Sequence, residues 1–177
     1  VIVEEDVENL PQDMTVYKVS ESREALTVIA GNFYEHPSKK LNMIGVTGTN
    51  GKTSTTYFME SILNTIGHKT GVIGTVETRI GGKKRDIKFA TSTTPDTLDL
   101  NAILKLMADE NVEDLVMEVS SHGLALKKVD GIDFNIGIFT NLTQDHLDFH
   151  KTMENYCLAK AKLFKMCKTG IINVDDK

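Results

Sequence analysis

The chain has 177 residues, of which 40% are hydrophobic and 25% are charged, and this is the composition of an ordinary globular protein. Intrinsic disorder of the whole chain is excluded, because disordered chains have fewer apolar residues and a higher net charge. A total of 20 Lys and Arg against 25 Asp and Glu gives a net charge of −5, which argues against a broad basic surface for nucleic acid. No apolar run approaches the roughly 18–20 residues of a membrane span. We therefore expect neither a nucleic-acid partner nor a membrane partner.

The two cysteines and the chain ends also limit the interpretation. Cys157 and Cys167 are too few for a disulfide framework, so we expect reduced thiols and a cytoplasmic location. The N-terminal residues show no basic region followed by an apolar segment, and no signal peptide is predicted. Because the chain begins in one predicted strand and ends directly after another, we expect it to be part of a longer sequence.

Residues 1–40 are predicted to form a short strand, a loop, a second strand over 15–19 and a helix. Ser20 is the expected cap of that helix, and the apolar residues of one of its faces are Ala25, Leu26, Ile29 and Ala30. The polar run 37–40 is the expected linker. We therefore expect a domain boundary near residue 41, with residues 41–177 forming the front part of a second domain.

From residue 41 onward, short apolar strands alternate with helices. Strands are predicted at 43–46, 70–76, 115–119, 136–140 and 171–174, with a hairpin turn at 81–82. Helices are predicted after residue 51, from 94–95 and over 153–164. The helical positions expected to face the core are Tyr57, Phe58, Ile62, Ile66, Leu98, Ile103, Leu106 and Met107. This pattern predicts the α/β class, a mostly parallel sheet with helices on both faces.

The strongest functional signal is the run GTNGKT at 48–53, between a predicted strand and a predicted helix. Glycines allow a tight turn that aims backbone N–H groups at phosphate oxygens, and the helix N-terminus adds free donors. Lys52 would reach the outer phosphates, and the Thr53 hydroxyl would bind Mg²⁺. Val46 stands where the usual P-loop has its first glycine, so a turn without a ligand is the alternative. The flanking elements and the Lys-Thr pair favour nucleotide binding.

A polar cluster follows the predicted strand 115–119, where ligands of open α/β sheets bind. Glu118 ends this strand and is the expected second Mg²⁺ ligand. Ser120-Ser121-His122 comes next, but we reject a serine hydrolase. Neighbours in one loop do not reach the geometry that a nucleophile and its base need, and the sequence has no G-x-S-x-G elbow.

A second polar cluster, DHLD at 145–148 with His150, follows the predicted strand 136–140. No Cys/His spacing supports a closed zinc site here, so Mg²⁺ with oxygen and histidine ligands is the preferred interpretation. His150 taken alone is expected to be a solvated loop residue. Composition and spacing alone would likewise place Lys160 on the surface.

With these motifs the sequence resembles the Mur ligase family, and most closely its MurE type. The resemblance covers about residues 1–177 and is carried by VTGTNGKT at 46–53, STTP at 92–95, EVSSHGL at 118–124, TNL at 140–142 with DHLD at 145–148, and YCLAK at 156–160. The shifted glycines of the loop are normal in this family. The resemblance implies that residues 1–40 end an N-terminal domain that binds a UDP-linked substrate. It also implies that residues 41–177 begin a central, P-loop-containing ATP-binding domain.

The activity that the resemblance implies is ATP-dependent acid–amino acid ligation in peptidoglycan synthesis. ATP would phosphorylate the last carboxylate of UDP-N-acetylmuramoyl-L-alanyl-D-glutamate, and the amine of a diamino acid would then attack the acyl phosphate. These small molecules are the expected partners of a monomeric protein. The chain alone is expected to be inactive, because the domain that selects the amino acid would follow residue 177.

The resemblance also implies roles for single residues. The expected ATP-binding residues are Gly48, Thr49, Asn50, Gly51, Lys52, Thr53 and Asn141. The expected catalytic residues are Lys52, His146 and Lys160. The expected Mg²⁺ ligands are Thr53, Glu118, His146 and Lys160, with Lys160 carbamylated. The expected binding residues for the UDP-muramoyl substrate are Thr93, Thr94, Ser120 and Lys128.

Two positions depart from the family pattern. Lys128 stands where the family often has arginine, so it keeps the charge but lacks the two-pronged donor. Leu126 stands where some members have glutamine, and we assign it no binding role.

Other functions stay open. A folylpolyglutamate synthase or another Mur-type ligase would share the phosphate loop, although the Ser-Ser-His-Gly run after Glu118 argues against a folate enzyme. A non-catalytic nucleotide-binding fragment or a GTPase-like switch is the other alternative. The sequence has no Asn-Lys-x-Asp segment of the kind that specifies guanine.

Overall fold

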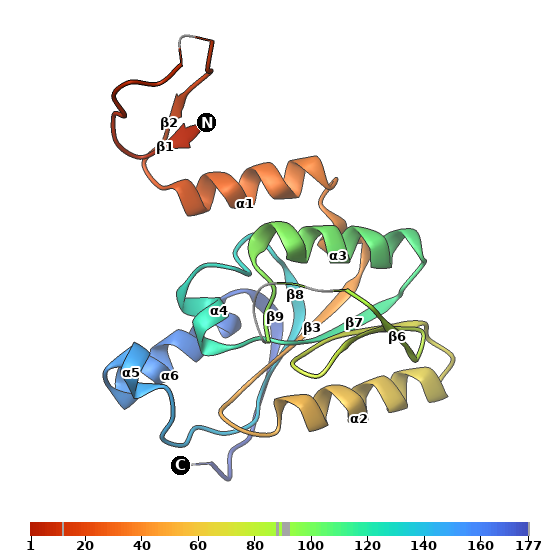
Figure 1. The fold of residues 1–177 in the computed structure, drawn as a ribbon. Helices are drawn as coiled ribbons and strands as arrows, with labels where there is room; N and C mark the ends of the chain where they lie inside the picture. Colours follow the sequence, from red (N-terminus) through yellow and green to blue (C-terminus); the bar gives the residue numbers. More distant parts are fainter. Residues whose placement is uncertain (12, 88, 90–92, 177) are drawn as a thin grey trace.

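The computed structural model describes residues 1–11, 13–87, 89 and 93–176, and within them the main feature is one seven-stranded sheet (Figure 1). The strand order is β6-β5-β4-β7-β3-β8-β9. The parallel strands are β4 (Thr70–Ile73), β7 (Asp114–Glu118), β3 (Asn42–Thr47), β8 (Phe134–Phe139) and β9 (Cys167–Ile172). An antiparallel hairpin of β5 (Thr78–Ile80) and β6 (Lys83–Arg85) forms one edge. The mostly parallel sheet and the hairpin at 81–82 are thus confirmed.

Helices cover both faces of the sheet, as predicted (Figure 1). α2 (Lys52–Thr65) covers one face through a small apolar cluster that contains Ile44, Val46, Val116, Met59 and Leu63. α3 (Thr97–Asp109) covers the other face through a larger cluster that includes Leu100, Leu104, Met107, Met43 and Leu115. Because successive residues of a strand point to opposite faces, Met43 and Ile44 enter different clusters. This double burial explains why the central strands are almost continuously apolar.

The shorter helices follow the carboxyl ends of β7 and β8. They are α4 (Ser121–Ala125), α5 (Leu147–His150), α6 (Met153–Ala161) and the 3₁₀ helix η2 (Lys162–Lys165). α4 packs against α6, and α5 also contacts α6. The side chain of Leu163 in η2 joins the α3 cluster. Among the described residues, no helix has the length and apolar character needed to cross a membrane.

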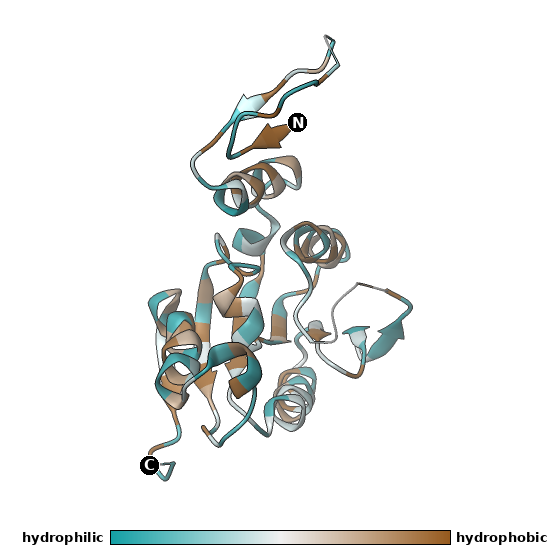
Figure 2. Cartoon of the chain, turned by 60° about the vertical axis from the view of Figure 1, so that its left-hand side comes forward, coloured by the Kyte–Doolittle hydropathy of each residue, from teal (hydrophilic) through white to brown (hydrophobic). Residues whose placement is uncertain are grey.

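The N-terminal segment lies outside the sheet, at the top of Figure 1. It contains a parallel pair of two-residue strands, β1 (Ile2–Val3) and β2 (Tyr17–Lys18), followed by α1 (Ser22–Phe33) and the 3₁₀ helix η1 (Pro37–Lys40). α1 packs against α3. In Figure 2 this segment stands clear of the sheet, and β6 forms a hydrophilic edge strand. The division into two domains near residue 41 stays a prediction.

Several predicted boundaries at the N-terminal side were wrong. The cap of α1 is Glu21, whose carboxylate accepts a hydrogen bond from the N–H of Arg23, and not Ser20. The second strand is shorter than 15–19. The expected linker at 37–40 is a helical turn in which Pro37 and Ser38 are buried. η1 contacts α3 and β3, and its role as a linker between domains stays a prediction.

The predicted core stripe of α2 was wrong in its most apolar members. Phe58, Ile62 and Ile66 are 68%, 58% and 63% exposed, whereas Thr56 and Glu60 are buried. The Glu60 carboxylate meets the guanidinium of Arg79 in β5 at 3.0 Å. Helical spacing identifies a stripe but does not fix which face turns inward. Here the phosphate loop at the start of α2 and the ion pair with β5 set that face.

In α3 the cap and part of the stripe also differ from the prediction. Asp96 caps the helix, so Pro95 precedes it instead of opening it. Leu98 and Leu106 are 48% and 40% exposed, whereas the predicted Ile103 and Met107 are buried.

Some strand and helix ends were also displaced. β4 ends at residue 73 and not 76, β9 begins four residues earlier than predicted, and the helix over 153–164 is α6 followed by η2.

Candidate active site

The phosphate loop, residues 48–53, joins β3 to α2 at the carboxyl edge of the parallel strands. Gly48 has φ +147° and Gly51 has φ +83°, conformations that other residues rarely adopt. A Cβ on Gly48 would lie 1.9 Å from Oγ1 of Thr140. Gly51 caps α2, and no side chain of the described residues takes part in that cap. The first N–H groups of α2 therefore remain suited to an anion.

Residues 140–143, directly after β8, hold this loop in shape. Asn141 Oδ1 accepts the N–H of Asn50 at 3.0 Å, and Asn141 Nδ2 donates to the Asn50 carbonyl at 3.1 Å. Thr140 Oγ1 donates to the same carbonyl at 2.6 Å. Thr49 Oγ1 accepts the N–H of Thr143 at 3.0 Å. In this structure Asn141 thus contacts the loop backbone and sets its geometry.

Two lysines converge on the carbonyl oxygen of Gly48. Nζ of Lys52 donates to it at 2.9 Å, and Nζ of Lys160 donates to it at 2.8 Å. Lys160 is only 2% exposed, so the surface position suggested by composition was wrong. Its ammonium lies 4.3 Å from the ring centroid of Tyr156, a cation–π contact that compensates part of the burial.

The same arrangement changes the proton affinity of both amines. Burial, and then the nearby charge of Lys52, lower the pKa of Lys160 to about 7. Burial also lowers the pKa of Lys52, while the charges of Glu118 and Asp145 act in the opposite direction. The lowered pKa brings the neutral amine of Lys160, which is the nucleophilic form, within reach of near-neutral pH.

Glu118 ends β7 with its carboxylate buried, since the residue is 1% exposed. Oε1 accepts the hydroxyl of Thr53 at 2.9 Å and the N–H of Thr75 at 3.0 Å. Oε2 meets the hydroxyl of Thr75 at 3.1 Å. A Cβ on Gly74 would lie 2.4 Å from Oε1, so this glycine lets the backbone approach the carboxylate. A buried carboxylate held by neutral donors is a strong oxygen ligand for a hard cation.

The predicted Mg²⁺ ligands are only partly brought together. No cluster of three His, Cys, Asp or Glu side chains suited to a metal occurs among the described residues. Mg²⁺ commonly takes one or two protein carboxylates and completes its shell with phosphates and water. Thr53 and Glu118 fit that pattern, because they touch at the base of the phosphate loop. His146 has Nε2 3.5 Å from Asp145 and its ring 4.8 Å from that of His122.

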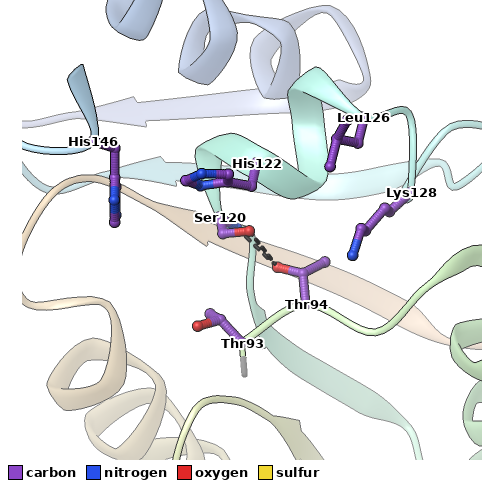
Figure 3. A pocket seen from close by; sticks show the side chains of 7 residues that line it. All are labelled: Thr93, Thr94, Ser120, His122, Leu126, Lys128 and His146. Carbon is purple, nitrogen blue, oxygen red and sulfur yellow. Dashed lines mark hydrogen bonds between the residues drawn. The ribbon is translucent and has the colours of Figure 1, made fainter. Parts of the chain in front are cut away.

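A cavity of about 390 Å³ lies beside the end of β7 (Figure 3). Its lining is Thr93, Thr94, Ser120, His122, Leu126, Lys128 and His146. All four residues predicted to bind the substrate therefore line one cavity. Thr94 Oγ1 lies 3.1 Å from Ser120 Oγ, the contact dashed in Figure 3, and accepts the Ser120 N–H at 3.0 Å. These bonds fix the floor of the cavity.

Lys128 supplies the positive charge of this cavity. The residue is 8% exposed, and its ammonium points toward the cavity in Figure 3. The neighbouring Lys127 instead turns to Glu21, the cap of α1, and to Glu24 within α1. A buried ammonium in a cavity lined with hydroxyl and imidazole groups is suited to an anionic ligand.

Two lining residues had no assigned role. His122 lies in the quoted EVSSHGL motif, and burial followed by the charge of His146 lowers its pKa. Leu126 was assigned no role because it departs from the family pattern. Its position in the sequence between Ser120 and Lys128, two predicted substrate-binding residues, could have indicated that it lines the same cavity.

His150 was expected to be a solvated loop residue, but it is only 6% exposed. Position 92, the first of the STTP motif, lies outside the described residues.

Comparison with known proteins decides the family, because residues 46–177 match the Mur ligase middle domain. This chain belongs to the Mur ligase family. It is 49% identical over 99% of its length to the UDP-N-acetylmuramoyl-L-alanyl-D-glutamate–2,6-diaminopimelate ligase of Clostridium botulinum, covering 36% of that protein. It is 53% identical over 96% of its length to the ligase of the same name from Clostridium tetani, covering 34%. The chain thus spans about a third of these relatives.

Solved structures give the same result for the fold. A UDP-N-acetylmuramoyl-L-alanyl-D-glutamate–2,6-diaminopimelate ligase superposes with a TM-score of 0.82 at 28% identity, over 99% of this chain and 35% of that chain. Escherichia coli FolC in complex with ADP superposes with a TM-score of 0.65 at 23% identity, over 84% and 41% of the two chains. The resemblance to the Mur ligase family is therefore confirmed, and the FolC likeness shows the shared fold alone.

The close approach at Gly48 gives a first test of the site. We expect Gly48→Ala to reduce ATP binding at least 10-fold, roughly 1.4 kcal/mol, because the new methyl collides with Thr140 and distorts the loop. Gly67→Ala is the matched control, since Gly67 also has a positive φ but a Cβ added there would meet nothing within 4 Å. The control should cost only about 1 kcal/mol of unfolding free energy. Urea unfolding and ATP titration of both variants check this, and equal behaviour would contradict it.

Proposed function

We propose that the protein carrying this chain is an ATP-dependent ligase that joins a diamino acid to UDP-N-acetylmuramoyl-L-alanyl-D-glutamate. One observation carries the proposal: a continuous chain of side-chain hydrogen bonds connects the phosphate loop to the cavity. Thr53 bonds to Glu118, Glu118 bonds to Thr75, and Thr75 Oγ1 lies 3.0 Å from Thr93 Oγ1 at the cavity. A substrate anion in the cavity would therefore lie close to the terminal phosphate of ATP on the loop.

The reaction that this arrangement of loop and cavity supports is activation of a carboxylate. A carboxylate oxygen attacks the γ-phosphorus of ATP, the bond to the bridging oxygen breaks, and ADP leaves with the electron pair. Two anions must approach each other, so positive charge from Lys52 and the N-terminus of α2 would stabilise the transition state. The amine of the diamino acid then bonds to the acyl carbon, loses a proton, and inorganic phosphate leaves.

The substrate side of the cavity has matching groups. The ammonium of Lys128 would pair with an anionic group of the UDP-muramoyl substrate. Thr93, Thr94 and Ser120 would hydrogen-bond its polar atoms. The curated relatives are named 2,6-diaminopimelate ligases, which favours 2,6-diaminopimelate as the incoming amine. The names of these relatives also favour this function over a folate ligase.

We assign the metal and the lysine modification on local chemistry. Thr53 and Glu118 would hold Mg²⁺, and His146 would contribute to a second ion; the bound metal would neutralise phosphate charge. The neutral amine of Lys160 would attack the carbon of CO₂ and lose one proton to solvent, and the resulting carbamate would place an anion beside the loop where the protonated lysine is a cation. The buried position of Lys160 and its pKa of about 7 support this. A monomer in the cytoplasm, without nucleic-acid or membrane partners, stays a prediction.

Ligand-dependent melting tests the function. Mg-ATP at 100 times its Kd should stabilise the chain by about 2.7 kcal/mol, which is a rise of roughly 5–10 °C in Tm. UDP-N-acetylmuramoyl-L-alanyl-D-glutamate should raise Tm as well, whereas Mg-GTP and dihydrofolate should not. Lys52→Ala should remove the ATP shift but not the substrate shift. A larger shift with GTP or dihydrofolate, or no shift with ATP, would contradict the proposal.

The carbamate can be observed directly by NMR with ¹³C-bicarbonate. We expect one carbamate signal that is absent in Lys160→Arg, since arginine keeps the charge but has no free amine. Because the folded pKa of Lys160 lies far below the usual 10.5, the neutral amine should increase as pH rises through about 7. The signal should accordingly grow between about pH 6 and 8. A signal that persists in the arginine variant would rule out Lys160 as its source.

A further inference from the structure

One buried histidine joins the two halves of the candidate site. His150 ends α5, and its Nε2 lies 2.9 Å from Oγ of Ser121, the first residue of α4. Ser121 is 2% exposed, so this hydrogen bond is shielded from water. Buried hydroxyl groups are costly to leave without a partner. The pair therefore fixes the position of α4 relative to α5.

α4 needs such an anchor because it is only five residues long. Short helices have few backbone hydrogen bonds and depend on side-chain contacts. One anchor is Ser120, which accepts the N–H of Gly123 at 3.0 Å and contacts Thr94 in the cavity floor. The second anchor is the adjacent Ser121, whose hydroxyl is hydrogen-bonded to His150. His122, the next residue, lines the cavity and lies with its ring 5.5 Å from that of His150.

On its other side His150 reaches the phosphate loop through Tyr156. The two rings lie 5.0 Å apart with an interplanar angle of 38°. The Tyr156 hydroxyl lies 3.1 Å from Oγ1 of Thr49. The ammonium of Lys160 lies over the Tyr156 ring in a cation–π contact. The carbonyl of His150 also accepts a hydrogen bond from Asn155 Nδ2 at 3.1 Å, which ties it to α6. His150 thus contacts His122, which lines the cavity, and Tyr156, which contacts the phosphate loop.

We infer that His150 is a positioning residue that, through Ser121, holds α4 against α5 and α6 and couples occupancy of the cavity to nucleotide binding on the loop. The coupling half of this inference rests on the proposed function. The first half, that His150 holds α4, concerns the protein without ligands and is tested separately.

Hydrogen exchange of the α4 backbone amides tests the first half. His150→Leu removes the partner of Ser121, and exchange in α4 should become about 10-fold faster, equivalent to about 1.4 kcal/mol. His150→Gln offers an amide where Nε2 stood and should restore most of the protection. Ser121→Ala should loosen α4 too, and the double variant with His150→Leu should be no looser than the worse single one. Unchanged exchange in His150→Leu would overturn the inference.

His68→Leu is the matched control. His68 Nδ1 lies 2.6 Å from Asp114 at the start of β7, the end of the strand remote from the cavity. Its loss should lower Tm without changing exchange in α4. Faster α4 exchange in this control would show that α4 reports general loss of stability, and the positioning role would then be rejected.

Coupling is measured as the ratio of the ATP dissociation constants without and with saturating UDP-N-acetylmuramoyl-L-alanyl-D-glutamate. We expect a ratio of about 5 or more in the unchanged chain and in His150→Gln, and about 1 in His150→Leu. An unchanged ratio in His150→Leu, or a ratio of 1 in the unchanged chain, would overturn the coupling. If the unchanged chain binds neither ligand, the proposed function fails, whereas the exchange experiment still decides whether His150 holds α4.

Discussion

The buried carboxylate of Glu118 is the constraint on which the candidate site depends. A carboxylate that is 1% exposed must be compensated, because transfer of an unpaired charge from water is prohibitively costly. The compensation comes from the ends of two other segments, Thr53 at the start of α2 and Thr75 after β4. Parallel strands end at the same edge of a sheet, so β3, β4 and β7 bring these groups together. The glycine at position 74 is needed because any side chain there would occupy the space of the carboxylate.

This arrangement connects the phosphate loop to the cavity. The carboxylate faces the phosphate loop, while the backbone carbonyl of Glu118 accepts a hydrogen bond from Thr94 at 3.2 Å on the cavity side. Glu118 thus contacts both Thr53 at the phosphate loop and Thr94 in the cavity lining. A second connection runs through Ser121, His150 and Tyr156. The proposed ligation would need such fixed geometry more than it would need reactive side chains.

Local patterns predicted those features that depend on neighbours in sequence. The strand–loop–helix unit around Lys52 and the acid at the end of β7 follow from residue order alone. The family resemblance then named four residues for binding the UDP-muramoyl substrate, and all four line one cavity in the structure. Features that depend on three-dimensional packing were missed. The apolar positions Phe58 and Ile62 face outward because the loop and Arg79 orient α2. Lys160 and His150 are buried by segments distant in sequence, which no spacing rule reveals.

The central claim is that Glu118 and Thr53 complete a metal–nucleotide site, and Mn²⁺ in place of Mg²⁺ makes it directly observable. Electron paramagnetic resonance would report the free Mn²⁺ remaining when the chain is titrated in the presence of ATP. Glu118→Gln keeps the size of the side chain and one acceptor oxygen but removes the charge. The account predicts that this variant binds Mn²⁺ with ATP roughly 10–100-fold more weakly than the unchanged chain, while its Tm without ligands changes little. Equal Mn²⁺ affinity in the two proteins would contradict the account.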